Sequence, residues 1–161
     1  MTTLAGTAGS SGSTDATGTS ARFSSPGGIT TDGTNLYVTD RGNHSIRKIV
    51  ISTGVVTTLA GTGSSGSTDH ATGTSASFNN SYGITTDGTN LYVSDFGNHT
   101  IRKIVIDNGT VTTLAGTAGT SGSTDNATGT SARFDSPWGI TTDGTNLYVA
   151  DYMNDRIRKI E

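Results

Sequence analysis

Residues 28–38 read Gly-Ile-Thr-Thr-Asp-Gly-Thr-Asn-Leu-Tyr-Val, and the same stretch recurs at 83–93 and at 139–149. Two shorter motifs repeat around it with the same spacing. Thr-Thr-Leu-Ala-Gly-Thr begins at Thr2, Thr57 and Thr112, and Ile-Arg-Lys-Ile begins at Ile46, Ile101 and Ile157. A fixed period, here about 55 residues, is the signature of a repeat architecture in which each repeat is one supersecondary unit. The chain is therefore an array of near-identical units.

Each repeat contains four short segments rich in β-formers and separated by turn residues. In the first repeat the predicted strands cover residues 28–32, 36–39, 45–51 and 55–59, with turns at 32–35 and 52–54. Asp-Gly and Thr-Gly pairs between such segments are typical of hairpin turns. Because β-branched residues dominate and glycine interrupts every stretch long enough for three helical turns, we expect essentially no α-helix.

Four antiparallel strands per repeat form one blade of a β-propeller. The sequence therefore predicts an all-β fold, a β-propeller with three four-stranded blades per chain. Polar stretches at about 7–22, 62–77 and 117–133 connect one blade to the next. They are long for loops in a compact domain. We expect them to be ordered surface loops, because Ala21 and Phe23, with their equivalents, can anchor the far end of each loop in the core.

Three segments of the first copy resemble the NHL repeat. They are Phe-Ser-Ser-Pro-Gly-Gly-Ile at 23–29, Leu-Tyr-Val-Thr-Asp at 36–40 and Gly-Asn-His-Ser-Ile-Arg-Lys-Ile at 42–49. The resemblance implies blades of a ring that usually contains six. Such repeats occur in RNA-binding and protein-binding modules, in an amidating lyase and in bacterial proteins of unassigned role, so the fold does not by itself assign a function. This chain departs from the pattern in its long inter-blade loops and in Asn154-Asp155, which replaces Asn-His.

The repeat is cut between strands, which predicts assembly. Across residues 1–161 we expect one fourth strand at 2–6, full blades at about 23–60 and 78–115, and three strands of a split blade at about 134–160. Three blades cannot close a ring, so the N-terminal strand of one chain is expected to complete the last blade of another. Two chains would give six blades and three chains would give nine. The predicted interface is Thr2, Thr3, Leu4, Ala5, Ile157, Arg158, Lys159 and Ile160.

Composition limits the partners. The net charge is −3 and the chain has no cysteine, so neither general nucleic-acid binding nor a disulfide or thiolate metal site is expected. No apolar run is long enough to span a bilayer, and the N-terminus lacks the basic and apolar regions of a signal peptide. We therefore expect no membrane partner, and the cellular compartment stays open.

Two repeated groups invite a chemical interpretation. His44 and His99 occupy equivalent positions and would ring the axis of an assembly, but hydrogen bonding beside the third strand is the simpler reading, and no metal or other cofactor is predicted. Asp40 precedes Arg47 by seven residues in each copy, across a hairpin. A repeated structural ion pair is expected rather than acid–base catalysis, because identical groups in every blade do not provide the differentiated pair that a reaction needs.

The remaining charged positions favour structural roles. The Arg-Lys pairs at 47–48, 102–103 and 158–159 are expected to lie along the blade surface with their heads in water rather than to bind RNA. Asp15, Asp69 and Asp125 are expected to cap local turns, because they lack the dense carboxylates of a calcium loop.

These observations predict a non-enzymatic, self-assembling propeller scaffold. Near-identity of the copies indicates an engineered or designed array, and a recent duplication is the alternative origin. The alternative function is a natural binding module that holds a protein, peptide or glycan through its long inter-blade loops.

Overall fold

The computed structural model describes residues 1–161 and confirms the all-β prediction. Its only helical elements are three-residue 3-10 turns. The first sheet contains β1 (Pro26–Thr31), β2 (Asn35–Asp40), β3 (Ser45–Val50) and β4 (Val56–Ala60); the second contains β5 (Ile84–Thr86), β6 (Asn90–Asp95), β7 (Thr100–Val105) and β8 (Val111–Ala115); the third contains β9 (Pro137–Thr142), β10 (Leu147–Asp151) and β11 (Arg156–Ile160). The 3-10 turns are η1 (Gly18–Ser20), η2 (Arg41–Asn43), η3 (Gly73–Ser75), η4 (Phe96–Asn98), η5 (Gly129–Ser131) and η6 (Tyr152–Asn154). No helix is long and apolar enough to cross a membrane.

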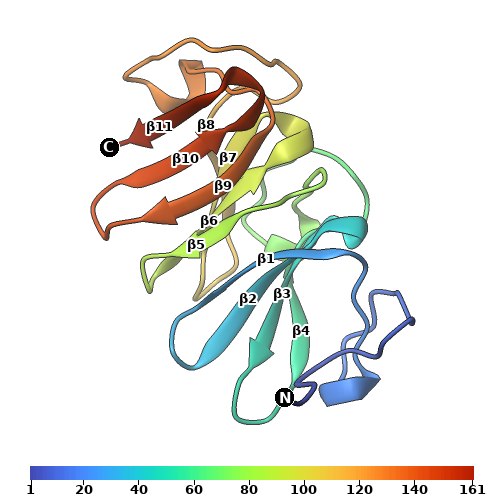
Figure 1. The fold of residues 1–161 in the computed structure, drawn as a ribbon. Helices are drawn as coiled ribbons and strands as arrows, with labels where there is room; N and C mark the ends of the chain where they lie inside the picture. The colour runs from blue at the N-terminus through green and yellow to red at the C-terminus, as the bar shows by residue number, and fades with distance from the viewer.

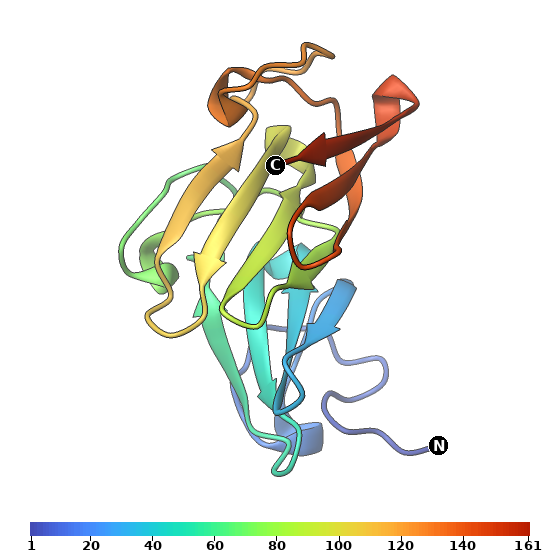
Figure 2. The same ribbon diagram turned by 90° about the vertical axis from the view of Figure 1, so that its left-hand side faces the viewer.

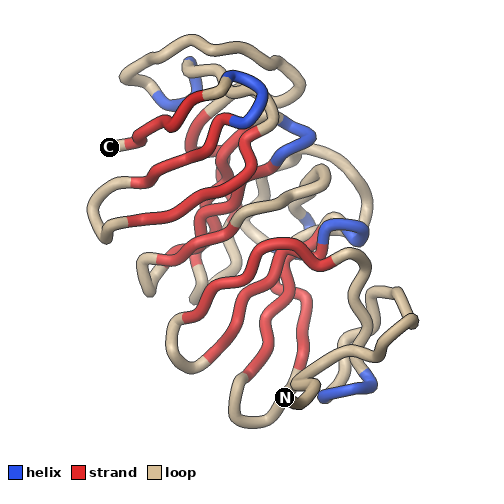
Figure 3. The backbone as a smooth tube through the Cα atoms, viewed as in Figure 1, coloured by secondary structure: helices blue, strands red, loops and turns tan.

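Every sheet is a meander of antiparallel neighbours, in the order β1-β2-β3-β4, β5-β6-β7-β8 and β9-β10-β11. The sheets fan out as three blades, with β1, β5 and β9 as neighbouring inner strands (Figure 1). The chain termini lie at opposite ends of this array (Figure 2). Residues 2–6, predicted as a strand, have no strand partner in the single chain and follow a loop path (Figure 3). Blade 3 accordingly has three strands and an open edge on β11.

The turn between the first two strands of each blade is stabilised by its own aspartate. In the second copy, Asp87 Oδ1 accepts the backbone N–H groups of Thr89 and Asn90, and Oδ2 accepts the Tyr92 hydroxyl. Burial acts to raise the pKa of Asp87, but hydrogen bonds from Asn90, Thr89 and Tyr92 outweigh it and lower the pKa to about 2. Burial and the same carboxylate raise the pKa of Tyr92 to about 12. Gly88 takes φ +89°, a left-handed conformation that favours glycine at this turn.

Two of the three apolar clusters lie between blades. Tyr37, Ile46 and Ala60 of blade 1 pack against Phe78 and Leu91 of blade 2. At the corresponding junction of blades 2 and 3, a second apolar cluster contains Ile101, Ala115, Phe134 and Val149. The third cluster lies within blade 1, where Val38, Ile49 and Val56 pack against Ala21 of the blade's own loop.

The inter-blade loops are ordered, as predicted. In the first loop, the Gly12 N–H donates to the carbonyl of Phe23 and the Arg22 N–H donates to that of Thr14. Both bonds recur in the other two loops. The donors are the N–H groups of Gly66 and Ser77 in the second loop and those of Gly122 and Arg133 in the third. Of the residues predicted to anchor the loops, Ala21, Ala76 and Phe78 are fully buried, whereas Phe23 of the first loop is only partly buried.

The Asp87 turn makes the acid stability of the fold testable. Its folded pKa of about 2 lies below the ordinary value of 3.8, so between these values the unfolded chain binds more protons. The stabilisation is therefore complete above about pH 4 and is lost as the pH falls towards about 2. We expect Asp87→Asn to lower the free energy of unfolding by on the order of 1 kcal/mol at neutral pH, with the difference from the parent shrinking below about pH 4.

Urea denaturation at a series of pH values measures this difference. Asp107→Asn, in the exposed turn between β7 and β8, is the control and should not reproduce the effect. A difference for Asp87→Asn that stayed constant down to about pH 2 would contradict the assignment.

Candidate functional site

A buried arginine joins three segments of each blade. The Arg47 side chain, on β3, is fully buried, and its Nη1 donates to Asp40 Oδ2 at 2.7 Å and to the carbonyl of Arg22 at 2.9 Å. Its guanidinium also contacts Asp15 in the preceding loop and lies over the Phe23 ring, 5.0 Å from the centroid. The equivalent ion pairs are Arg102 with Asp95 at 2.9 Å and Arg158 with Asp151 at 2.8 Å. The predicted ion pair is confirmed in all three blades.

Two predictions about neighbouring charges are wrong. Arg47 and Arg102 do not extend their heads into water, because the loop folds back over the blade and encloses both guanidinium groups. Asp15 and Asp69 do not cap local turns. Asp15 Oδ2 accepts the Thr58 N–H on β4 at 2.9 Å, so this carboxylate connects the loop to two strands distant from it in sequence.

The third blade breaks this pattern at Asp125. Asp15 and Asp69 each bind a strand arginine and also a threonine of the outer strand, Thr58 and Thr113 respectively. Asp125 contacts Arg158, but blade 3 has no outer strand in this chain to supply the threonine. The Asp125 side chain is accordingly 80% exposed, compared with 43% for Asp15 and Asp69. One carboxylate oxygen is thus available to a donor from outside the blade.

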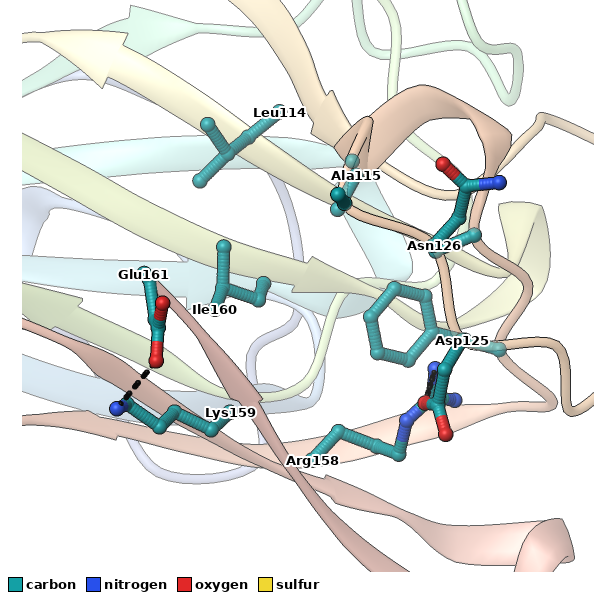
Figure 4. A pocket seen from close by; sticks show the side chains of 12 residues that line it. Leu114, Ala115, Asp125, Asn126, Arg158, Lys159, Ile160 and Glu161 are labelled. Carbon is teal, nitrogen blue, oxygen red and sulfur yellow. Dashed lines mark hydrogen bonds and ion pairs between the residues drawn. The ribbon is translucent and has the colours of Figure 1, made fainter.

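An open groove of about 550 Å³ lies beside Asp125. Its walls come from Leu114 and Ala115 of β8, from Phe134, and from Arg158 and Ile160 of the β11 edge (Figure 4). The equivalent positions in blades 1 and 2 are covered by the outer strands β4 and β8. Of the predicted interface residues, Arg158, Lys159 and Ile160 line this groove. Ile157 lies on the same edge strand but outside the groove.

The predicted N-terminal interface residues lie at the other end of the array. The Gly6 N–H donates to the carbonyl of Gly18 at 3.1 Å. The Gly61 N–H, directly after β4, makes the same bond to Gly73 at 3.0 Å. Leu4 and Ala5, which directly precede Gly6, are therefore placed beside the loop of blade 1 as Leu59 and Ala60 of β4 are placed beside the loop of blade 2. Thr2 and Thr3 precede them and are exposed, with no sheet edge beside them in this chain.

Both terminal blade faces leave apolar side chains exposed. Ile157 is 75% exposed, whereas its equivalents Ile46 and Ile101 are completely buried against the next blade. On the opposite face of the array, Ile29 is 59% exposed, whereas its equivalent Ile84 in the middle blade is 6% exposed. The terminal blades thus present the two complementary halves of an internal blade junction.

The histidines connect neighbouring blades. His44 and His99 take left-handed backbone conformations after η2 and η4. Nδ1 of His44 accepts the Asn80 N–H at 3.2 Å, and Nδ1 of His99 accepts the Ser136 N–H at 3.0 Å. Both bonds agree with the hydrogen-bonding role predicted for these histidines.

Comparisons with known proteins identify the repeat. Residues 23–49 match the NHL repeat. The chain is 38% identical over 104 residues to NHL repeat-containing protein 2 of Bos taurus, and 36% identical over 107 residues to the Homo sapiens protein of that name. These matches cover 62% and 64% of this chain but only 14% and 15% of the relatives.

The architecture matches solved propeller structures. An auxiliary nutrient binding protein from Bacteroides thetaiotaomicron aligns with a TM-score of 0.73 and 27% identity, over 83% of this chain and 36% of that one. By sequence, the chain contains an NHL repeat at residues 23–49 and is similar to NHL repeat-containing protein 2 over 62% and 64% of its length in the two alignments. Its three antiparallel sheets correspond to propeller blades, which confirms the all-β, blade-forming part of the predicted fold class.

The buried arginine network yields a stability test in the middle blade. Arg102→Met leaves the buried Asp95 carboxylate without its counter-charge, and burial already raises the pKa of Asp95. Removing one partner of a buried pair costs about 3–5 kcal/mol, so we expect a loss of that size in the free energy of unfolding, measured in urea. Lys103→Met, one residue along β7 and only half-buried, should change stability by less than about 0.5 kcal/mol. Equal effects of the two substitutions would contradict the network's role.

Proposed function

We propose that this chain is a non-enzymatic propeller scaffold whose ring is completed by a second copy of itself, with six blades from two chains. The observation that carries the proposal is the open β11 edge, with Asp125 facing the position that Thr58 and Thr113 occupy in the other blades. A second copy supplies the same sequence at that position. Its residues 2–6 are identical to 57–61 and to 112–116, the segments that form the outer strands of blades 1 and 2.

The register of this pairing follows from the complete blades. Ile46 pairs with Ala60, Arg47 with Thr58 and Lys48 with Thr57, and the same register recurs between β7 and β8. Transferred to blade 3, Ile157 pairs with Ala5 of the second copy, Arg158 with Thr3 and Lys159 with Thr2. The Thr3 N–H then meets the open oxygen of Asp125. Pairing also satisfies the backbone groups of the β11 edge, which otherwise invites unspecific strand addition.

The apolar faces support the same assembly. The exposed face that contains Ile157 is equivalent to the blade 1 face on which Ile46 is buried against blade 2. The exposed face that contains Ile29 is equivalent to the blade 2 face on which Ile84 is buried against blade 1. Joining them repeats an internal junction, and removing such apolar surface from water stabilises the complex by about 25 cal/mol per Å². A two-fold ring contains two such junctions and leaves no blade face open.

The non-enzymatic part of the proposal rests on repetition. The buried ionisable groups have the same partners from blade to blade. Asp95 pairs with Arg102 in blade 2 in the same way that Asp40 pairs with Arg47 in blade 1. Catalysis by proton transfer needs two groups in different environments. An engineered array and a recent duplication both account for copies this similar, and either origin provides the matched faces that a ring requires.

Ligand binding is the second candidate function. The Bacteroides thetaiotaomicron neighbour is an auxiliary nutrient binding protein, so a protein with this blade architecture binds a ligand. The inter-blade loops of this chain are weak candidates for that role, because Asp15 and Asp69 tie two of them to buried arginines. The feature that favours binding is instead a row of aromatic side chains at the ends of the inner strands.

The mass of the native protein tests the ring. Light scattering behind size exclusion at micromolar concentration is expected to give the mass of two chains. Ile157→Glu places a charge in the proposed junction and should shift the protein to a single-chain mass, because an unpaired charge is not tolerated in an apolar interface. Ile51→Glu, at an exposed isoleucine in the turn between β3 and β4, is the matched control and should leave the mass unchanged.

Other masses would overturn the proposal in defined ways. A three-chain mass would replace the six-bladed ring by a nine-bladed one. A single-chain mass for the parent protein would assign the β11 edge to another partner or to a further segment of a longer protein, and would end the self-assembly proposal.

A further inference from the structure

The three copies differ most informatively at two positions. The residue before the invariant glycine of the first strand is Gly27, Tyr82 or Trp138, and the residue after the invariant aspartate is Arg41, Phe96 or Tyr152. Their neighbours Gly28 and Asp40 are the same in every copy. These two positions are therefore not required to be alike by the blade itself, and in the second and third copies both hold large aromatic side chains.

Side chains from these positions meet across all three blades. The Tyr82 and Trp138 rings lie 4.0 Å apart between centroids, and Tyr152 continues the series at 5.4 Å from Trp138. Phe96 contacts Tyr82 at 4.9 Å and meets Trp138 edge-on at 5.7 Å. At the other end, the Arg41 guanidinium lies 4.2 Å above the Tyr82 ring. We call these five side chains, Arg41, Tyr82, Phe96, Trp138 and Tyr152, the aromatic row.

Two members of the aromatic row are exposed, and the other three are partly buried. Trp138 is 43% exposed and Tyr152 is 54% exposed. Contiguous exposed apolar groups mark interaction sites more often than isolated ones do. Three members of the row, Arg41, Tyr82 and Trp138, line a shallow groove of about 480 Å³ beside the inner strands. Tyr152 lies outside this lining and extends the site from Trp138. Pockets with aromatic walls and a few convergent polar groups are the usual form of ligand sites.

The single charge of the groove is positive and is held in position. Arg41 Nε donates to Asn80 Oδ1 at 3.1 Å, and the guanidinium packs on Tyr82. The two terminal nitrogens of Arg41 have no acceptor within the chain, and no carboxylate lines the groove. A guanidinium with a fixed plane and free terminal nitrogens is suited to bidentate binding of a carboxylate.

We propose that the aromatic row binds a carbohydrate that carries carboxylate groups, with sugar rings against Trp138 and Tyr152 and a carboxylate on Arg41. A sugar ring has an apolar C–H face that packs on one exposed aromatic ring, whereas a flat aromatic ligand gains most between two rings. Tyr82 and Trp138, the two rings of the groove, are in contact with centroids 4.0 Å apart and leave no slot between them. Single-stranded nucleic acid also stacks on aromatic platforms, but its binding needs a cationic groove. This groove has one cation, in a chain of net charge −3.

All five side chains belong to one chain, and the groove is formed in the single chain without ring completion. Trp138 is the only tryptophan, which makes its fluorescence a direct reporter of the groove. The probe is trigalacturonic acid, compared with neutral galactotriose and with a uridine hexanucleotide, titrated into the native protein. A saturable fluorescence change with trigalacturonic acid is expected, with weaker binding of both comparison ligands.

Three variants assign the contacts. Arg41→Gln should weaken trigalacturonic acid binding about tenfold and remove its advantage over galactotriose. Tyr152→Ala should weaken binding of both sugars about threefold to tenfold. Arg133→Gln is the matched control, because Arg133 donates only to carbonyls of its own loop, and it should leave the affinity within about twofold of the parent.

The proposal is overturned by any of four results. These are no fluorescence change with trigalacturonic acid, equal affinity for the neutral trisaccharide, unchanged affinity in Tyr152→Ala, and tighter binding of the uridine hexanucleotide. The last result would assign the aromatic row to nucleic acid. Circular dichroism of each variant separates a loss of binding from a loss of fold.

Discussion

The rest of this structure depends on the buried guanidinium of each blade. Apolar residues make up only 30% of the chain, and two of the three apolar clusters lie between blades, so the aliphatic core of a single blade is small. Arg47 compensates by binding the end of β2 through Asp40, the preceding loop through Asp15 and the Phe23 ring through its face. Charge-assisted hydrogen bonds of this kind are about twice as strong as neutral ones. They explain why a long loop rich in glycine and serine is ordered.

This arrangement also has a cost. Burying a guanidinium removes its hydration, and the Nε atoms of Arg47 and Arg102 have no acceptor in the chain. A buried pair is stabilising only when good geometry offsets the desolvation of both charges. The same network therefore makes each blade sensitive to whatever completes it. Where the outer strand is missing, as in blade 3, Asp125 loses one set of donors and Arg158 becomes slightly exposed.

Local patterns in the sequence were sufficient for the strands, the turns and the ion pair of Asp40 with Arg47. Each depends on residues close in the chain, such as the aspartate that binds the two backbone N–H groups following its own glycine. The role of Asp15 was missed because its partners Arg47 and Thr58 are 32 and 43 residues away. The burial of Arg47 was missed for the same reason, since the loop that encloses it shows no apolar periodicity.

The aromatic row could not be predicted from local sequence patterns either. Tyr82 and Trp138 occupy one position of the repeat and Phe96 and Tyr152 another, and nothing in their spacing shows that they meet. They meet because β1, β5 and β9 converge as neighbouring inner strands. The signal that could have indicated it was the difference between copies. A position that varies among near-identical repeats is one where the blade fold does not require a particular residue.

The order of residues along the row sets how many sites a two-chain ring would contain. Arg41 of blade 1 packs on Tyr82 of blade 2, and Phe96 of blade 2 meets Trp138 of blade 3. In both cases, the residue that follows the invariant aspartate of one blade contacts a residue of the next blade. The contacted residue is the one that precedes the invariant glycine of that next blade. At the junction between chains, Tyr152 would by this rule approach Gly27 of the second copy, which has no side chain to continue the stack. The row is therefore interrupted at each chain junction, and a closed ring would hold two separate aromatic rows related by the two-fold axis rather than one continuous annulus.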